Sequence, residues 1–130
     1  MAHAALALRS GDAARAITAL ESAAPYDLGQ LNDVFTFALY PVYLRGEAYL
    51  AAKQGSAAAA EFQKVLDYAG VVGNEPIGAL AHLGLSRAFA LSGDNAKAKN
   101  AYQDFFGLWA NSDAGVPVLA QAKAEYAKLQ

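Results

Sequence analysis

Apolar residues recur at helical spacing along the chain, in short stretches separated by turn residues. The clearest example runs from Leu80 to Phe106, where two amphipathic helices meet at the turn Ser92-Gly93-Asp94. Glycine suits the left-handed conformation that ends a helix, and Asp94 can accept a hydrogen bond from the first free amides of the next helix. Neither helix can bury its apolar side alone, so we expect the pair to stack on similar pairs.

The same pattern predicts helices on both sides of this central pair. We expect them at about 3–9, 13–23, 40–53, 57–68 and 117–129, and the pair itself is expected to begin near Pro76. Pro41 and Pro76 fit the first turn of a helix, where a missing amide costs little. Ser56 and Asn74 are the expected caps of their helices, and the segment 26–38 fits either a loop or the start of a helix.

A short motif appears twice and indicates a repeat. The stretch GDAARA at 11–16 returns as GDNAKA at 93–98, with the turn, the alanines and the basic residue in the same order. We therefore divide the single domain, 1–130, into repeat units at about 3–25, 39–69 and 77–110, followed by a capping helix at 116–129.

Composition and charge narrow the class of protein. Apolar residues make up 55% of the chain, and the formal net charge of −2 gives no basic field for a phosphate backbone. Because cysteine is absent, disulfides and thiolate metal sites are excluded. No signal peptide or membrane-spanning run is visible, so we expect a cytoplasmic segment that does not insert into membranes and is cut from a longer polypeptide.

The residues of the central unit follow a known repeat pattern: a large residue, a leucine with a small residue, an aromatic residue, a glycine turn, then alanine and aromatic positions. They are His82, Leu85, Ser86, Phe89, Gly93, Ala98, Tyr102 and Phe105. The preceding unit matches with Val42, Arg45, Gly46, Tyr49, Ala58, Phe62 and Val65, and its turn glycine is displaced to Gly55. The first unit keeps mainly Gly11, Ala16, Leu20 and Ala23.

This arrangement resembles the tetratricopeptide repeat, which implies an all-α, right-handed helical-repeat solenoid of about three helix pairs plus a C-terminal capping helix. Some features depart from that family. The signature alanines Ala16, Ala58 and Ala98 lie 42 and then 40 residues apart, longer than the family's period of about 34. Ser86 stands where the family has glycine, and the proline that ends each repeat is missing.

A closer resemblance concerns four runs: LYPVYLRGEAYLAA, NEPIGALAHLGLSRAFALSGD, AYQDFFGLW and QAKAEYAKL. They resemble the C-terminal repeat region of bacterial multidomain regulators, including eukaryote-like serine/threonine kinases and repeat-bearing transcriptional regulators. The resemblance implies that the chain is the interaction arm of a larger bacterial signalling or regulatory protein. The kinase motifs themselves, a Gly-rich phosphate loop, His-Arg-Asp and Asp-Phe-Gly, are absent.

Residues for catalysis are not visible in the sequence. The two histidines, His3 and His82, do not form a metal-ligand spacing, and His82 occupies a packing position of the repeat. No catalytic triad can be assembled, because the turn serines fit caps better. We therefore expect no enzyme activity, no cofactor and no metal.

The resemblance also implies where a partner would bind. In this family the first helix of each pair lines a concave groove, and those positions carry over to Tyr40, Tyr43, Glu47, Leu50, Leu80, Leu83, Arg87 and Leu91. The cationic pair that grips a terminal carboxylate in some members is missing, so recognition of an apolar or aromatic peptide fits better, with Arg87 and Glu47 setting its orientation. The alternative is that these side chains pack against segment 26–38 or the capping helix.

Four large apolar residues crowd the end of the central pair: Phe105, Phe106, Leu108 and Trp109. They point all round a helix, more than one buried face can hold. Either the C-terminal helix covers the surplus, or the residues form a patch for self-association. The second possibility gives the alternative function, a homo-oligomerisation domain.

Overall fold

The computed structural model describes residues 2–26, 39–68, 76–111 and 115–129. Within these ranges the chain forms helices and no strand, which confirms the all-α class. The elements are α1 (Ala2–Arg9), α2 (Ala13–Glu21), a 3-10 turn (Ala24–Tyr26), α3 (Tyr40–Ala51), α4 (Gly55–Asp67), α6 (Pro76–Leu91), α7 (Asn95–Leu108) and α8 (Pro117–Ala127).

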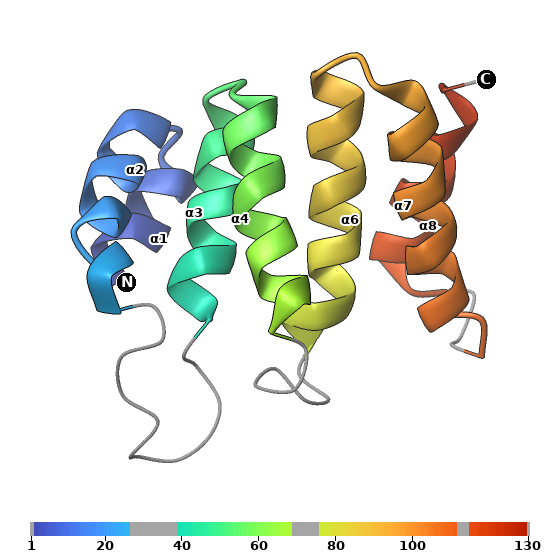
Figure 1. Cartoon of the computed structure of the whole chain (residues 1–130), viewed down its shortest axis with the longest axis horizontal. Coiled ribbons are helices and arrows are strands. Elements are labelled where there is room, and N and C mark those ends of the chain that lie inside the picture. The colour runs from blue at the N-terminus through green and yellow to red at the C-terminus, as the bar shows by residue number, and fades with distance from the viewer. Residues whose placement is uncertain (1, 27–38, 69–75, 112–114, 130) are drawn as a thin grey trace.

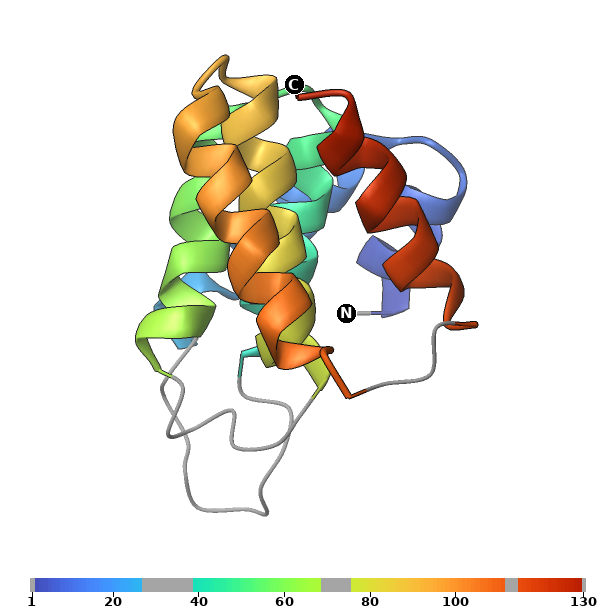
Figure 2. The ribbon, with the colours of Figure 1, turned by 90° about the vertical axis from the view of Figure 1, so that its right-hand side faces the viewer.

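The helices stand beside one another in the order of the chain (Figure 1). Each of the helices α1 to α7 packs against the next, and α3 also touches α1 and α6, so α1, α3 and α6 are neighbours in one layer. Figure 2 shows α4 and α7 on one side of this layer, with α8 on the other side. None of the described helices is both long and apolar enough to cross a bilayer.

Two of the turns between paired helices have the same construction. Gly11 and Gly93 both have positive φ, +82° and +84°. The carboxylate of the following aspartate then caps the next helix: Asp12 Oδ1 accepts from the Arg15 amide at 3.0 Å, and Asp94 Oδ1 from the Lys97 amide at 3.1 Å. The glycine and aspartate roles predicted for the 93–94 turn are confirmed.

The turn between α3 and α4 differs from the prediction. Lys53, not a glycine, has the left-handed conformation (φ +62°), and the cap position is Gln54 rather than Ser56. Gly55 lies inside α4, where an added Cβ would stand 2.8 Å from the carbonyl oxygen of Ala88 in α6. This glycine therefore permits close helix approach instead of forming the turn.

The predicted helices all exist, with small errors at their ends. α2, α3 and α8 end two residues earlier than expected, and α4 begins two residues earlier. Pro41 lies in the first turn of α3 as predicted. The segment 27–38 and the cap assigned to Asn74 fall outside the described residues.

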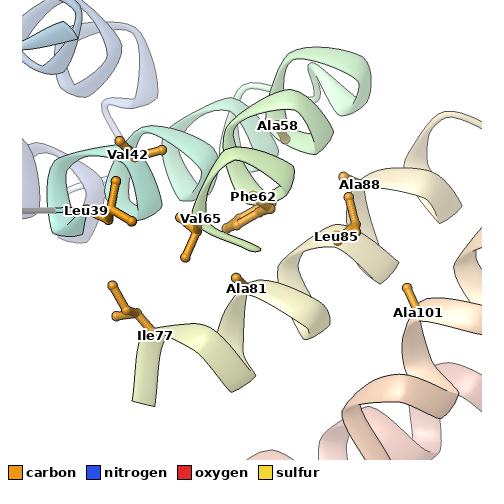
Figure 3. Packing of buried hydrophobic residues seen from close by; sticks show 10 residues of the cluster. All are labelled: Leu39, Val42, Ala58, Phe62, Val65, Ile77, Ala81, Leu85, Ala88 and Ala101. Atoms are coloured by element: carbon orange, nitrogen blue, oxygen red, sulfur yellow. The ribbon is translucent and has the colours of Figure 1, made fainter. Parts of the chain in front are cut away.

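The central core is organised around Phe62, whose side chain is completely buried (Figure 3). Its ring lies between two glycines of neighbouring helices. A Cβ added at Gly46 in α3 would meet the ring at 2.8 Å, and one added at Gly84 in α6 would meet it at 2.5 Å. The two missing side chains are thus what allows α4 to insert its phenylalanine between α3 and α6. The buried residues of this cluster are Leu39, Val42, Ala58, Phe62, Val65, Ile77, Ala81, Leu85, Ala88 and Ala101.

Candidate functional site

The residues expected to bind a partner lie on α3 and α6, which are neighbours in the structure. Most are partly buried, and Leu91 is 41% exposed. Leu83 is different: it is 1% exposed and packs in a cluster with Tyr102, Phe105, Leu119 and Ala122. Leu83 therefore does not line an open surface, because α7 and α8 cover it.

On α3, Tyr43 contacts the hydrophobic core with its ring and the carboxylate of Glu47 with its hydroxyl. Its ring packs edge-on against Phe62 with centroids 5.7 Å apart, and its hydroxyl is hydrogen-bonded to Glu47. Burial, assisted by the neighbouring carboxylate of Glu47, raises the pKa of Tyr43 well above its ordinary value. The hydroxyl is therefore neutral at physiological pH and serves as a hydrogen-bond donor to Glu47.

Glu47 faces α6, where the nearest cation is Arg87. Burial raises the pKa of Glu47, although the positive charge of Arg87 and the hydrogen bond from Tyr43 oppose that rise. The charge of Arg87 thus only partly compensates the burial of this carboxylate.

The main partner of Arg87 is Glu125 of α8. The Arg87 Nε donates to Glu125 Oε2 at 2.9 Å, and Nη2 donates to Oε1 at 2.9 Å, which is a two-pronged pairing. Tyr102 of α7 adds a third donor, with its hydroxyl 2.8 Å from Oε2. Burial alone would raise the pKa of Glu125, but these hydrogen bonds outweigh it and hold the pKa below its usual value.

Part of the expected groove is covered by the capping helix α8, which is one of the two alternatives that the sequence left open. Arg87 and Leu83 contact the capping helix, whereas Tyr43 and Glu47 lie beyond the pairing with Glu125. The sequence offered no signal for the Arg87–Glu125 pair, whose members are 38 residues apart.

The lowered pKa of Glu125 predicts an acid transition at α8. A carboxyl whose folded pKa is lowered contributes its stabilisation above the unfolded value near 4.5, and loses it as the pH falls through the folded pKa. Trp109, the one tryptophan, packs in the same cluster as Leu119. We expect its emission to shift to the red at acidic pH in the native chain.

A Glu125→Gln chain tests that assignment, because it lacks the titrating group. Its emission should already be shifted at neutral pH, and the acid step should disappear. Asp67→Asn, an exposed carboxyl on α4, is the matched control and should keep the step. An unchanged acid step in Glu125→Gln would assign the transition to another carboxylate.

The aromatic end of α7 is largely covered, as the first of the two interpretations predicts. Phe105 is fully buried, and Phe106 and Trp109 pack around it together with side chains of α8. The Phe106 ring meets Tyr126 of α8 edge-on, with centroids 5.7 Å apart. Leu108 remains 60% exposed beside this cluster.

The described residues do not form a metal site. Among them, no three side chains of metal-ligating type come together. Burial lowers the pKa of His82, with Asp104 opposing the shift, which is what a packed histidine shows. That the chain is not an enzyme stays a prediction.

Comparison with known proteins adds no assignment. No protein-family model matches the sequence, and no curated protein sequence matches it significantly. The resemblance to tetratricopeptide repeats therefore rests on the residues quoted above and on the arrangement of the helices.

Proposed function

We propose that this chain is a non-catalytic scaffold of tetratricopeptide type that binds a peptide or protein segment on the face shared by α3 and α6. The observation that carries the proposal is the gathering of Tyr40, Tyr43, Glu47 and Arg87, all partly exposed, on these two adjacent helices. Tyrosine and arginine are the side chains that most often anchor protein interfaces.

The helix arrangement supports the repeat interpretation. Three consecutive helix pairs pack in chain order, and the first helix of each pair touches that of the next. In two of the pairs, the first helix is connected to the second by the same Gly-Asp turn. A right-handed solenoid with α8 as its cap is the architecture that fits these contacts. On the resemblance of its sequence runs, the chain is the interaction arm of a larger bacterial signalling protein in the cytoplasm.

A second candidate function is self-association. Its supporting observation is Leu108, which is 60% exposed next to the aromatic cluster at the end of the stack. An exposed apolar residue beside a large aromatic surface is a natural contact for a second copy. This candidate places the interface on α7, away from the face of α3 and α6.

Two exposed leucines separate the candidates. Leu91 lies at the end of α6, one turn beyond Arg87, and is 41% exposed, whereas Leu108 lies on α7. We expect Leu91→Lys to weaken a partner peptide about tenfold, because an added charge at an apolar contact must be desolvated. Leu108→Lys should leave that affinity within about twofold. The peptide is selected from a displayed library with the full chain as bait and then titrated by calorimetry.

Both variants keep the core intact, so their melting curves should match the native chain. Light scattering over a range of concentrations measures self-association in the same samples. A native chain that forms dimers, which Leu108→Lys dissolves, would establish the second candidate. A selected peptide that binds Leu91→Lys as tightly as the native chain would refute the proposed face.

A further inference from the structure

Three hydrogen-bond donors from two helices converge on one carboxylate of a third. Arg87 supplies two of them from α6 and Tyr102 supplies the third from α7, and all three reach Glu125 of α8 at 2.8 to 2.9 Å. Tyr102 is only 2% exposed, and the Arg87 side chain is 29% exposed. The buried Tyr102 hydroxyl requires an acceptor, because leaving it unpaired is costly. The partly exposed Arg87 can be hydrated in part, so the carboxylate mainly gives it a charged, bidentate partner.

An apolar wall surrounds these donors. Leu83 and Phe105 are buried beneath α8, and Phe106 packs against Tyr126. On the α8 side only Leu119 and Ala122 are buried. Leu119, Ala122 and Glu125 follow one another at intervals of three residues, so they form one stripe of a helix. The surface therefore fits a helix whose buried apolar stripe is followed by a carboxylate.

The attachment of α8 is slight compared with that of the other helices. It has no side-chain cap at its N-terminus, and it packs closely on α7 while reaching α6 through side chains. Its fully buried apolar residues are one leucine and one alanine, and the other apolar contacts of this segment, Val116, Val118, Tyr126 and Leu129, are only partly buried. Partial burial stabilises less, since the gain is roughly proportional to the area removed from water. The specific part of the contact is the carboxylate.

We propose that the surface of α6 and α7 beneath α8 is a receptor for an acidic amphipathic helix of a partner protein, and that α8 occupies this receptor until the partner displaces it. The partner helix would place a Glu or Asp on Arg87 and Tyr102 and apolar residues on Leu83 and Phe105. This inference rests on the proposed scaffold function and names the chemistry of its ligand.

The charges favour an acidic partner over a neutral one. When Glu125 leaves, Arg87 loses its bidentate acceptor, while the charge of Glu47 continues to act on it. A helix without a carboxylate would leave the buried Tyr102 hydroxyl without its acceptor and would give Arg87 no charged partner. A second copy is a poorer candidate than a partner protein. Its α8 has the same sequence as the α8 already in place, and it lacks the high effective concentration that attachment to the same chain gives.

The test uses the full chain and a fluorescent peptide of residues 116–129, VPVLAQAKAEYAKL, which contains the natural stripe. Ala122→Asp in the chain puts a charge in the buried contact and should release α8, with Trp109 emission reporting the release. Anisotropy should then show the peptide binding this opened chain about tenfold more tightly than the native chain, in which α8 competes at high effective concentration.

Two changes examine the carboxylate receptor. In the opened chain, the peptide carrying Glu125→Gln should bind about tenfold or more weakly, and so should the natural peptide after Arg87→Met, because charged hydrogen bonds are lost. Arg15→Met, an exposed arginine of α2, should leave binding unchanged. Leu119→Ser is a second opening variant, and amide exchange in α3, α4 and α6 checks that either chain keeps its fold.

Equal binding of the Glu and Gln peptides would overturn the inference, as would an opened chain that gains no affinity. An opened chain that dimerises in light scattering would assign the receptor to a second copy and overturn the partner. These results do not depend on the library peptide. If the α8 peptide experiments fail but the library peptide still binds Leu91→Lys more weakly than the native chain, the scaffold function stands and the acidic helix is refuted. If the α8 peptide experiments succeed but the library peptide binds both chains equally, only the α3–α6 face is refuted.

Discussion

Replacing Phe62 with alanine is expected to lower the free energy of unfolding by about 3–5 kcal/mol, the upper part of the range for core truncations. The ring is completely buried, and its neighbours at the closest approach are Gly46 and Gly84. Glycines have no side chain that could relax into the space, so the cavity would remain largely open. Denaturant unfolding followed by far-UV circular dichroism measures the loss.

The glycines provide the converse test of the same contact. Gly84→Ala would drive a methyl group to 2.5 Å from the ring, and overpacking of this kind costs about 1–3 kcal/mol. The penalty should become much smaller when Phe62 is first replaced with alanine, which makes room. Gly107→Ala is the matched control, since no atom lies within 4 Å of its added Cβ, and it should be neutral or stabilising by up to about 1 kcal/mol. Additive effects of Gly84→Ala and Phe62→Ala would contradict the interlocked packing.

Features that depend on a few adjacent residues were predictable from the sequence. The turn at Gly93 and the cap at Asp94 were correct because left-handed glycine and side-chain capping are local chemistry. The turn before α4 was wrong for the opposite reason. Gly55 is a glycine because α6 approaches it, and an unrelated residue, Lys53, takes the left-handed conformation.

The faces of the central helix show where hydrophobic periodicity stops being informative. The sequence predicted one apolar side for this helix, and the resemblance to the repeat family placed Leu83 on the groove. In the structure Leu85 belongs to the cluster around Phe62, and Leu83 belongs to the cluster beneath α8. α6 packs against helices on several sides, so the pattern along its own sequence could not divide its leucines between two cores.

The candidate site was predicted in position but not in its connections. Tyr43, Glu47 and Arg87 were assigned to one face of neighbouring first helices, and they do lie there. The pairing of Arg87 with Glu125 and the hydrogen bond from Tyr102 to Glu125 could not be derived from the sequence. Both depend on how α8 packs over α6. Opposite charges far apart in a sequence carry no sign of their pairing.

A second large loss of stability is expected from Arg45→Met. The side chain is 3% exposed, and its Nη1 donates to the Leu20 carbonyl oxygen at 3.2 Å while Nη2 donates to Glu61 at 2.9 Å. Leu20 lies in the last turn of α2, where the helix dipole favours a cation. Its carbonyl oxygen also accepts from the Ala23 amide at 3.0 Å, so Arg45 supplies a further donor to this helix end. Methionine keeps much of the volume but removes every donor.

We expect Arg45→Met to cost about 2–3 kcal/mol, below the ~3–5 kcal/mol for breaking a fully buried pair, because Glu61 stays 18% exposed and can be hydrated. Denaturant unfolding measures the total, and amide exchange should rise most in α2, which Arg45 ties to the second helix pair. Glu61→Gln keeps an acceptor and should cost only about 1 kcal/mol. Arg15→Met, on the exposed side of α2, should stay within about 0.5 kcal/mol.

The opposite result for Arg45 would also be informative. Apolar residues that replace a buried ion pair sometimes pack well enough to compensate for it. If Arg45→Met unfolds at the same denaturant concentration as the native chain, the packing of α2 on α3 and the Tyr49–Glu21 hydrogen bond are enough to join the first two helix pairs. If it loses stability while Glu61→Gln does not, the loss belongs to contacts of the guanidinium other than the pair with Glu61. The bond to the Leu20 carbonyl, by which the next repeat supplies a donor to the end of α2, is one of these contacts.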